Sequence, residues 1–140
     1  MFFKVLMLFM ACQFIYADFI RDDEKSIVKD KKTNLIWQDD AISPKVRWKK
    51  TENYCAQLRL DDKTDWRVPK LKELETLVGD RKESPAIKDI FTQVVADGYW
   101  SADEFDGYAG FAWMVHFHSG NNYKYAKSTS IHVRCVREGK

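Results

Sequence analysis

The chain has 140 residues, of which 31% are charged and 45% hydrophobic. This length predicts one domain. The formal net charge at pH 7 is only +2, which gives no argument for a nucleic-acid-binding protein, because such proteins usually carry a strong basic patch.

Residues 1–17 have the features of a cleavable export signal. Lys4 is the only charge in this segment, and the residues that follow it are almost all apolar. A basic start, an apolar core and a small residue before the cut are the parts of a secretory signal. The apolar run is shorter than the roughly 20 residues that a spanning helix needs. We expect cleavage between Ala17 and Asp18, which leaves residues 18–140 as a single exported domain.

A second processing route is open at Cys12. The sequence Phe9-Met10-Ala11-Cys12 resembles the box at which bacterial lipoproteins are lipidated, although Phe9 stands where Leu is usual. Lipidation would make Cys12 the mature N-terminus and tether the protein to a membrane. Either route places the protein outside the cytoplasm, in the periplasm or at the cell surface.

Two cysteines, Cys55 and Cys135, remain after residue 17. In an oxidising compartment we expect the two cysteines of a small exported domain to form a disulfide. In the loop-entropy model this closure contributes about 4–5 kcal/mol. A pair of buried free thiols is the alternative.

The N-terminal part of the mature chain predicts a hairpin. Residues 18–24 are charged and are expected to be loose. Residues 26–30 and 35–38 are short apolar runs that a polar link containing Asn34 joins, a pattern typical of two antiparallel strands.

The centre of the chain predicts two helices. Residues 49–60 have an apolar stripe near helical spacing, with Thr51 as the expected N-cap. Residues 70–78 have apolar residues at intervals of three and four, namely Leu71, Leu74, Leu77 and Val78, and Gly79 is expected to end the helix. Residues 81–98 predict a loop, in which five apolar residues suggest one or two further helical turns: Ile87, Ile90, Phe91, Val94 and Val95.

The C-terminal third changes to a period of two. Residues 99–101 are expected to begin a sheet, and residues 119–122 form a hairpin turn before a returning strand at 122–126. Residues 131–136 alternate and predict a last strand. Residues 111–118 predict a strand whose buried face consists of Phe111, Trp113, Val115 and Phe117. A hairpin, two helices and an antiparallel sheet together predict an α+β fold.

Several short strings spread along the mature chain carry a resemblance to a known family. They are Val28-Lys29-Asp30, Thr33-Asn34-Leu35-Ile36-Trp37, Tyr54-Cys55 with Leu58, Asp65-Trp66-Arg67-Val68-Pro69 with Glu73-Leu74, Tyr99-Trp100-Ser101, Ala112-Trp113 with Val115, Phe117 and Gly120, and Val133-Arg134-Cys135-Val136-Arg137. On these strings the chain resembles the Lcl C-terminal domain family of bacterial exported proteins. Asn34 stands where the family usually has Gly, and Asn also tolerates a positive φ. Ala102 replaces a common second Ser.

The resemblance implies a C-type-lectin-like fold, in which two helices flank small antiparallel sheets. It also implies a disulfide from the first helix to the last strand, which Cys55 and Cys135 match. The named member of the family is an adhesin whose C-terminal domain is linked with glycosaminoglycan binding, so the resemblance favours a binding or adhesion module. The calcium–sugar motifs of true C-type lectins are absent from the sequence. We expect the acidic cluster of Asp103, Glu104 and Asp106 to be a solvated loop.

Two sets of residues are candidates for ligand binding. The last two strands and their turn carry a set of cations that could form a basic patch for an acidic or sulfated glycan: Lys124, Lys127, His132, Arg134 and Arg137. Dispersed solubilising charge is the alternative. Trp48 is the second candidate, because it lies among cations and outside the matched strings, whereas the other four tryptophans are expected in the core. Arg67 and Arg134 could instead pair with Asp30, Asp65 or Glu73.

A metal site and an enzymatic activity are both less favoured. His116, His118 and His132 could converge on zinc, but alternation along a solvent-facing sheet explains their spacing. The sequence has no evident pairing of an activated nucleophile with a base. We therefore expect a non-enzymatic binding module without a cofactor. The alternative is a structural or accessory protein that packs against an envelope protein.

Overall fold

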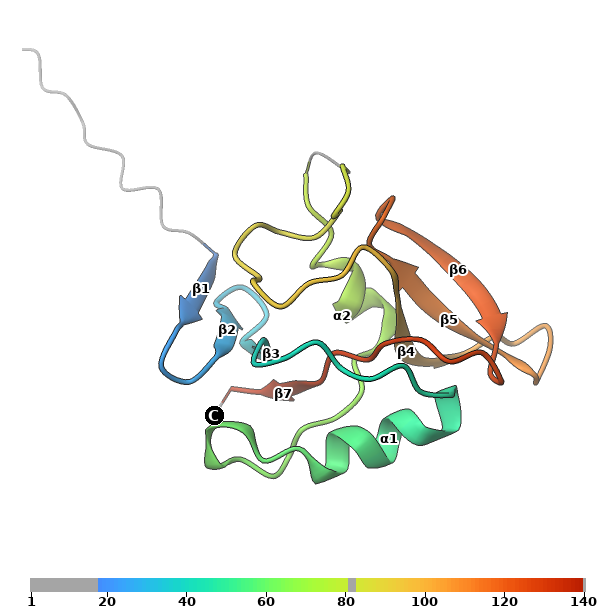
Figure 1. Ribbon diagram of the computed structural model, residues 1–140, viewed down its shortest axis with the longest axis horizontal. Helices are drawn as coiled ribbons and strands as arrows, with labels where there is room; N and C mark the ends of the chain where they lie inside the picture. Colours follow the sequence, from blue (N-terminus) through green and yellow to red (C-terminus); the bar gives the residue numbers. More distant parts are fainter. Residues whose placement is uncertain (1–17, 81–82, 140) are drawn as a thin grey trace, which may run out of the picture.

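The computed structural model describes residues 18–80 and 83–139, so the expected export signal and Cys12 lie outside the described residues. The fold is α+β, with two antiparallel sheets and two short α-helices (Figure 1). The elements follow in the order β1 (Phe19–Asp22), β2 (Ile27–Asp30), β3 (Leu35–Gln38), α1 (Trp48–Gln57), a 3₁₀ turn (Leu60–Asp62), α2 (Leu71–Glu75), β4 (Gly98–Glu104), β5 (Phe111–His116), β6 (Asn121–Ala126) and β7 (Val136–Glu138). No helix of the described residues is long and apolar enough to cross a bilayer.

The first sheet has the strand order β1-β2-β3-β7. The predicted hairpin of β2 and β3 is confirmed, and Asn34 in its turn has a φ of 60°. The expectation that residues 18–24 are loose is wrong, because Phe19–Asp22 forms β1 and pairs with β2. Phe19 anchors this strand by packing edge-on against Phe91, with 6.4 Å between ring centroids.

The two helices are shorter than expected. Thr51 is not the N-cap of α1; it is buried inside the helix, and its hydroxyl donates to the carbonyl of Trp48 at 2.7 Å. Arg47 takes the N-cap position. α2 ends at Glu75, but turns continue the helical period far enough to bury both Leu74 and Leu77. α2 packs against β4 and β5.

The described part of residues 81–98 contains no helix but has a hydrogen-bonded turn, in which the N–H of Phe91 donates to the carbonyl of Lys88 at 3.2 Å. Ile87 and Phe91 reach the core from a loop instead. The backbone N–H groups of Thr92 and Gln93 donate to the carboxylate of Asp39 at 2.9 and 3.0 Å. These bonds fix the loop backbone without a helix.

The second sheet has the strand order β4-β5-β6. The expected single buried face of β5 is wrong, because each face is buried over part of its length. Ala112 and Met114 pack with Trp100 and Ile131 in one cluster. Val115 and Phe117 instead join the main core with Leu74, Leu77 and Tyr99, while Phe111 and Trp113 are only partly buried. Different segments of the chain cover the two faces of β5, so the alternation of residues alone does not show which face is buried at a given position.

The segment 131–137 passes between the two sheets and is buried at every residue. It bridges Val46 through Ile131 and Tyr99 through His132, and only its last two residues belong to β7. The predicted last strand at 131–136 is therefore mostly irregular chain. The expected disulfide is confirmed: Cys55 of α1 is bonded to Cys135, with 5.6 Å between the Cα atoms.

Candidate ligand-binding groove

Arg134 is a structural residue rather than part of a surface patch. Its side chain is only 3% exposed. One guanidinium nitrogen donates to the carbonyl of Gln38 at 2.5 Å and to the carboxylate of Asp39 at 3.1 Å, and the other donates to the carbonyl of Gln93 at 2.6 Å. These bonds tie the C-terminal segment to the end of β3 and to the loop before β4.

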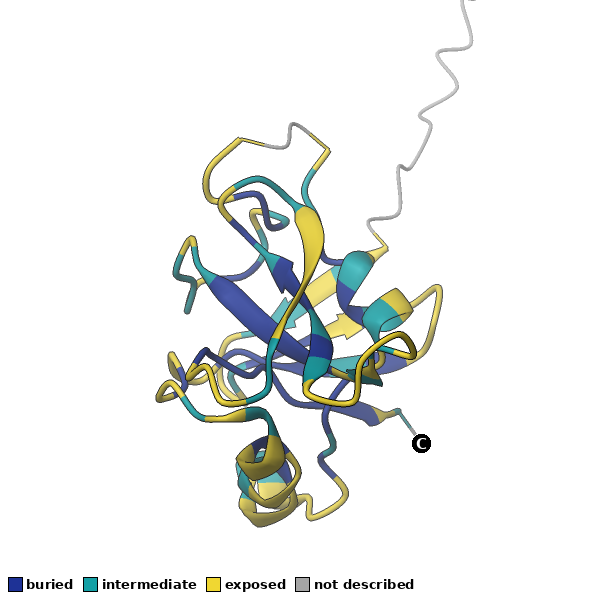
Figure 2. Cartoon of the chain, turned by 90° about the vertical axis from the view of Figure 1, so that its right-hand side faces the viewer, coloured by how far each residue is buried: buried dark blue, intermediate teal, exposed yellow. Residues whose placement is uncertain are grey.

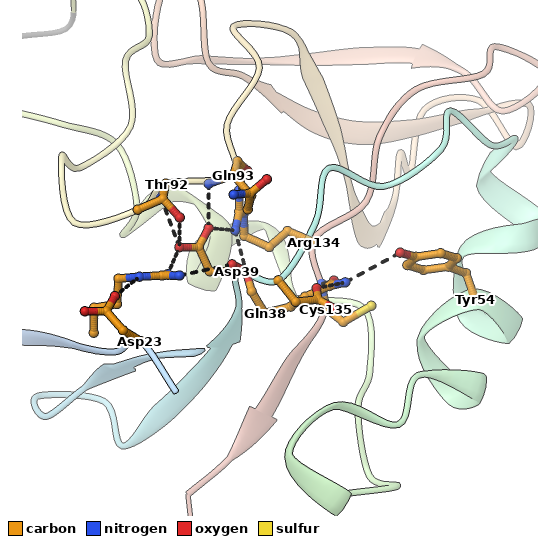
Figure 3. Close-up of polar contacts among 10 residues, drawn as sticks. Asp23, Gln38, Asp39, Tyr54, Thr92, Gln93, Arg134 and Cys135 are labelled. Atoms are coloured by element: carbon orange, nitrogen blue, oxygen red, sulfur yellow. Dashed lines mark hydrogen bonds and ion pairs between the residues drawn. The ribbon is translucent and has the colours of Figure 1, made fainter. Parts of the chain in front are cut away.

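Asp39 is the centre of this buried polar network (Figure 3). Its fully buried carboxylate pairs with Arg21 of β1 as well as with Arg134, and it accepts bonds from Thr92 and Gln93. A buried charge is tolerated when it is paired and hydrogen-bonded. No local pattern identified Asp39, because its partners come from distant parts of the chain.

His132 and Arg137 are also buried, so the prediction that they face solvent is wrong. Nδ1 of His132 donates to the carbonyl of Ser43 at 2.7 Å. Nε of Arg137 donates to Asp65 at 2.7 Å. The physical reason is the position of their segment between two sheets, where both sides of an extended chain are covered.

The histidines do not converge on one site. The rings of His116 and His118 lie 6.3 Å apart, while His132 is engaged with Ser43. Within residues 18–80 and 83–139, no group of three metal-binding side chains could hold an ion. The expectation that the acidic cluster is a solvated loop is wrong for two of its residues, because Asp103 and Glu104 belong to β4. Asp103 accepts the backbone N–H of Leu71 at 2.9 Å, and Glu104 lies 3.4 Å from Lys127.

Arg67 joins α2 to the C-terminal strand. The predicted pair with Glu73 is confirmed at 2.8 Å, and Arg67 also contacts Glu138 at 2.6 Å. Burial raises the pKa of Glu73, but hydrogen bonds from Arg67 and from the N–H of Lys70 outweigh it, so the pKa lies below its usual value. The hydrogen bond from Arg67 likewise lowers the pKa of Glu138.

Of the remaining candidates, Lys124 is exposed, whereas Lys127 and Trp48 are partly buried and the side chain of Lys127 is 13% exposed. Nζ of Lys124 is 4.0 Å from the ring centroid of Phe105. Nζ of Lys127 is 4.6 Å from the ring centroid of Trp48. Trp48 is half-buried and donates from its indole nitrogen to the carbonyl of Ser101 at 2.8 Å. Trp48 and Lys127, which the sequence placed in separate candidate sets, therefore form one unit.

A groove of about 730 Å³ lies beside this unit, between the start of α1 and the ends of β5 and β6. It is lined by Arg47, Lys49, Lys50, Tyr108, Ala109, Gly110, Phe111, Ala126, Lys127 and Ser128. Four of these residues are cationic, and none of the described lining residues is acidic. The sequence indicated Lys127 for binding and, of the cations at the start of α1, showed only that Trp48 lies among them.

The cations at the start of α1 are available to a ligand. Arg47, Lys49 and Lys50 are exposed, and their side chains make no ion pair or hydrogen bond within the described part of the chain. Tyr108 is 61% exposed and packs against Phe111, with 5.1 Å between ring centroids. The groove thus offers free positive charge beside an exposed aromatic ring, which suits a ligand with anionic groups on a ring-shaped body.

Comparison with known families gives one match. The family model of the Lcl C-terminal domain matches residues 26–137, which is most of the chain. The chain belongs to this family. Both helices, the disulfide and the whole groove lie within the matched part of the Lcl C-terminal domain, whereas β1 precedes it. No curated protein matches the chain.

Proposed function

We propose that this Lcl C-terminal domain is an exported, non-enzymatic binding module that recognises an acidic or sulfated glycan. The ligand occupies the groove between α1 and the ends of β5 and β6. The observation that carries the proposal is the set of three exposed cations, Arg47, Lys49 and Lys50, without intramolecular partners within the described residues. Hydrogen bonds between such cations and sulfate or carboxylate groups are stronger than neutral ones.

Two further contacts favour a glycan over a small inorganic anion. The exposed ring of Tyr108 offers an apolar face to a sugar ring while its hydroxyl stays in water. Lys127 is held between the Trp48 ring and Glu104 at the rim of the groove. Ordering such a side chain on binding costs less conformational entropy than ordering a free lysine.

The direct test measures binding of a heparin oligosaccharide to the mature domain by calorimetry at several salt concentrations. We expect the triple variant Arg47→Gln, Lys49→Gln, Lys50→Gln to bind about tenfold more weakly, since exposed charge pairs contribute about 0.2–1 kcal/mol each. The matched control removes three exposed lysines elsewhere, Lys29→Gln, Lys63→Gln and Lys72→Gln. Equal losses in both triple variants, or no binding by the wild type, would overturn the proposal.

The assignment of a C-type-lectin-like fold is also a proposal. The arrangement of two helices beside small antiparallel sheets, with a disulfide from α1 to the C-terminal segment, supports a C-type-lectin-like fold. An experimental structure superposed on C-type lectin domains tests this. We expect the two helices and the disulfide to coincide. A different strand connectivity would contradict the assignment.

Export is the third part of the proposal. The bond between Cys55 and Cys135 supports it, since structural disulfides persist in oxidising compartments. Mass spectrometry of the protein purified from its native host checks the mature N-terminus. We expect the chain to begin at Asp18. A diacylated Cys12 would replace the secretory route with a lipoprotein route, and a chain that begins at Met1 would contradict export.

A further inference from the structure

The outer edge of β6 differs from the edges at β4 and β7. At β4, the backbone of Trp100 donates to the carbonyl of His132 at 2.9 Å, so the C-terminal segment covers that edge. At β7, Val136 and Arg67 exchange backbone hydrogen bonds of 2.8 and 2.9 Å. β6 is the outermost strand of its sheet, and Figure 2 shows it exposed along nearly its whole length.

The backbone register shows which groups of β6 point outward. Lys127 donates to the carbonyl of Gly110 at 2.8 Å, and these two residues continue the register of β5 and β6. Because antiparallel pairs alternate, Tyr123 and Tyr125 direct their backbone groups toward β5. Asn122 and Lys124 direct theirs away from the sheet, at a spacing of about 6.8 Å. These outward groups match the backbone of an added strand.

The side chains of β6 leave this edge open. A lysine on an edge strand usually protects it from pairing. Here Lys124 turns back across its own sheet to the ring of Phe105, which in turn packs edge-on against Trp113 with 5.7 Å between centroids. On the opposite face of the strand, Tyr123 and Tyr125 are each 42% exposed.

We propose that the edge of β6 docks an extended segment of a protein partner, which adds a fourth strand to the β4-β5-β6 sheet. Main-chain hydrogen bonds would hold such a segment, and alternate side chains would set its identity. β6 contains no acidic residue and has Lys124 near its centre, while Asn122 on the same face already donates to Glu75 at 2.6 Å, so the partner carries an acidic residue opposite Lys124. It carries apolar residues on the face of Tyr123 and Tyr125, because aromatic and opposite-charge cross-strand pairs are favourable.

The outward backbone groups of Asn122 and Lys124 are not part of the groove lining, although the groove includes Ala126 at the end of β6, and the proposal goes beyond the proposed function. Strand addition at β6 is a specific way for the domain to pack against an envelope protein, which is the alternative function that the sequence left open. The partner is defined here by its chemistry, an extended chain of alternating acidic and apolar residues.

The test uses an end-capped, fluorescent heptapeptide of alternating valine and glutamate, with binding to the full mature domain followed by anisotropy. Two N-methylated versions separate backbone pairing from charge attraction, since each removes the N–H donors along one edge of the peptide. We expect one version to bind at least tenfold more weakly and the other to bind within about threefold of the parent. Equal affinities for all three peptides would overturn the proposal.

A charge reversal tests the identity of the partner. We expect Lys124→Glu to weaken binding of the glutamate peptide and to favour a matched peptide of valine and lysine. The same preference in the wild type and the variant would contradict the assignment. A concentration-dependent dimer that Lys124→Glu abolishes would assign the edge to a second copy of the chain and would also overturn the acidic partner.

Cross-checks keep this proposal distinct from the glycan proposal. The groove triple variant should bind the glutamate peptide as the wild type does, and Lys124→Glu should bind the heparin oligosaccharide as the wild type does. If the groove variant loses the peptide, charge in the groove holds the peptide and strand addition is wrong. A failure of heparin binding alone leaves the peptide result unchanged.

Discussion

Two groups of cations in this domain have opposite environments. Arg134 and Arg137, near the C-terminus, are buried and paired with Asp39 and Asp65. The cations at the start of α1 are exposed and have no partners within the described residues. Both groups consist of basic residues that lie close together in the sequence, so residue type alone does not distinguish them. Their position in the fold decides that the first group stabilises the domain and that the second is free to bind.

The largest expected effect is a loss of stability on removal of the disulfide, which holds the segment that carries Arg134 and Arg137. Replacing both cysteines, Cys55→Ala and Cys135→Ala, should lower the free energy of unfolding by about 4–5 kcal/mol, because the disulfide closes a long loop in the unfolded chain. Denaturant unfolding of the wild type and the double variant measures this. A loss below about 1 kcal/mol would mean that the C-terminal segment is held without the disulfide.

The next effect separates the two groups of cations directly. Arg134→Met should cost about 3–5 kcal/mol of unfolding free energy, because it leaves the buried carboxylate of Asp39 with one arginine fewer. The matched control, Lys50→Met, removes an exposed charge and should change stability by less than about 0.5 kcal/mol. Similar losses in both variants would remove the distinction between the groups.

A smaller effect concerns the surface pairs of Arg67. The folded-state pKa values of Glu73 and Glu138 are lowered, so the folded domain binds fewer protons than the unfolded chain in acid. The stability from these pairs is present above the ordinary glutamate pKa and is lost as the pH falls through the folded values. Glu73→Gln should cost about 1 kcal/mol at pH 7 and reduce the dependence of stability on pH in acid. An unchanged pH dependence would contradict this account.

The smallest expected effect is on heparin affinity and tests the aromatic ring of the groove. Tyr108→Ala should weaken heparin binding by about threefold, since an exposed aromatic contact contributes about 0.5–1 kcal/mol. Its stability should change little, because Tyr108 is largely exposed. The control, Tyr125→Ala, removes an exposed tyrosine outside the groove lining and should bind as the wild type does. Calorimetry on both variants checks the difference.

Local signals in the sequence were sufficient for some features. The β2–β3 hairpin followed from two apolar runs and a turn residue that tolerates positive φ, Asn34. The disulfide followed from the cysteine count and the expected compartment. The burial of Arg134 did not follow, because alternation along a strand indicates two faces and cannot show that a second sheet covers the outer one.

The groove could not be predicted as a unit. Its lining comes from residues 47–50, 108–111 and 126–128, which meet only in the folded chain. Two of its features were visible in advance, namely Trp48 among cations and Lys127 in a basic run. The contact between them depends on the position of α1 beside the end of β6, which no local pattern encodes.

The central claim is that the exposed cations of the groove bind the ligand, whereas the buried arginines do not. The most direct measurement is a titration of the isotope-labelled wild-type domain with a heparin tetrasaccharide, followed by amide chemical shifts. We predict saturable shifts concentrated at residues 47–50, 108–111 and 126–128, with little change at 132–137. Shifts concentrated at 132–137, or no saturable shifts at all, would contradict the account.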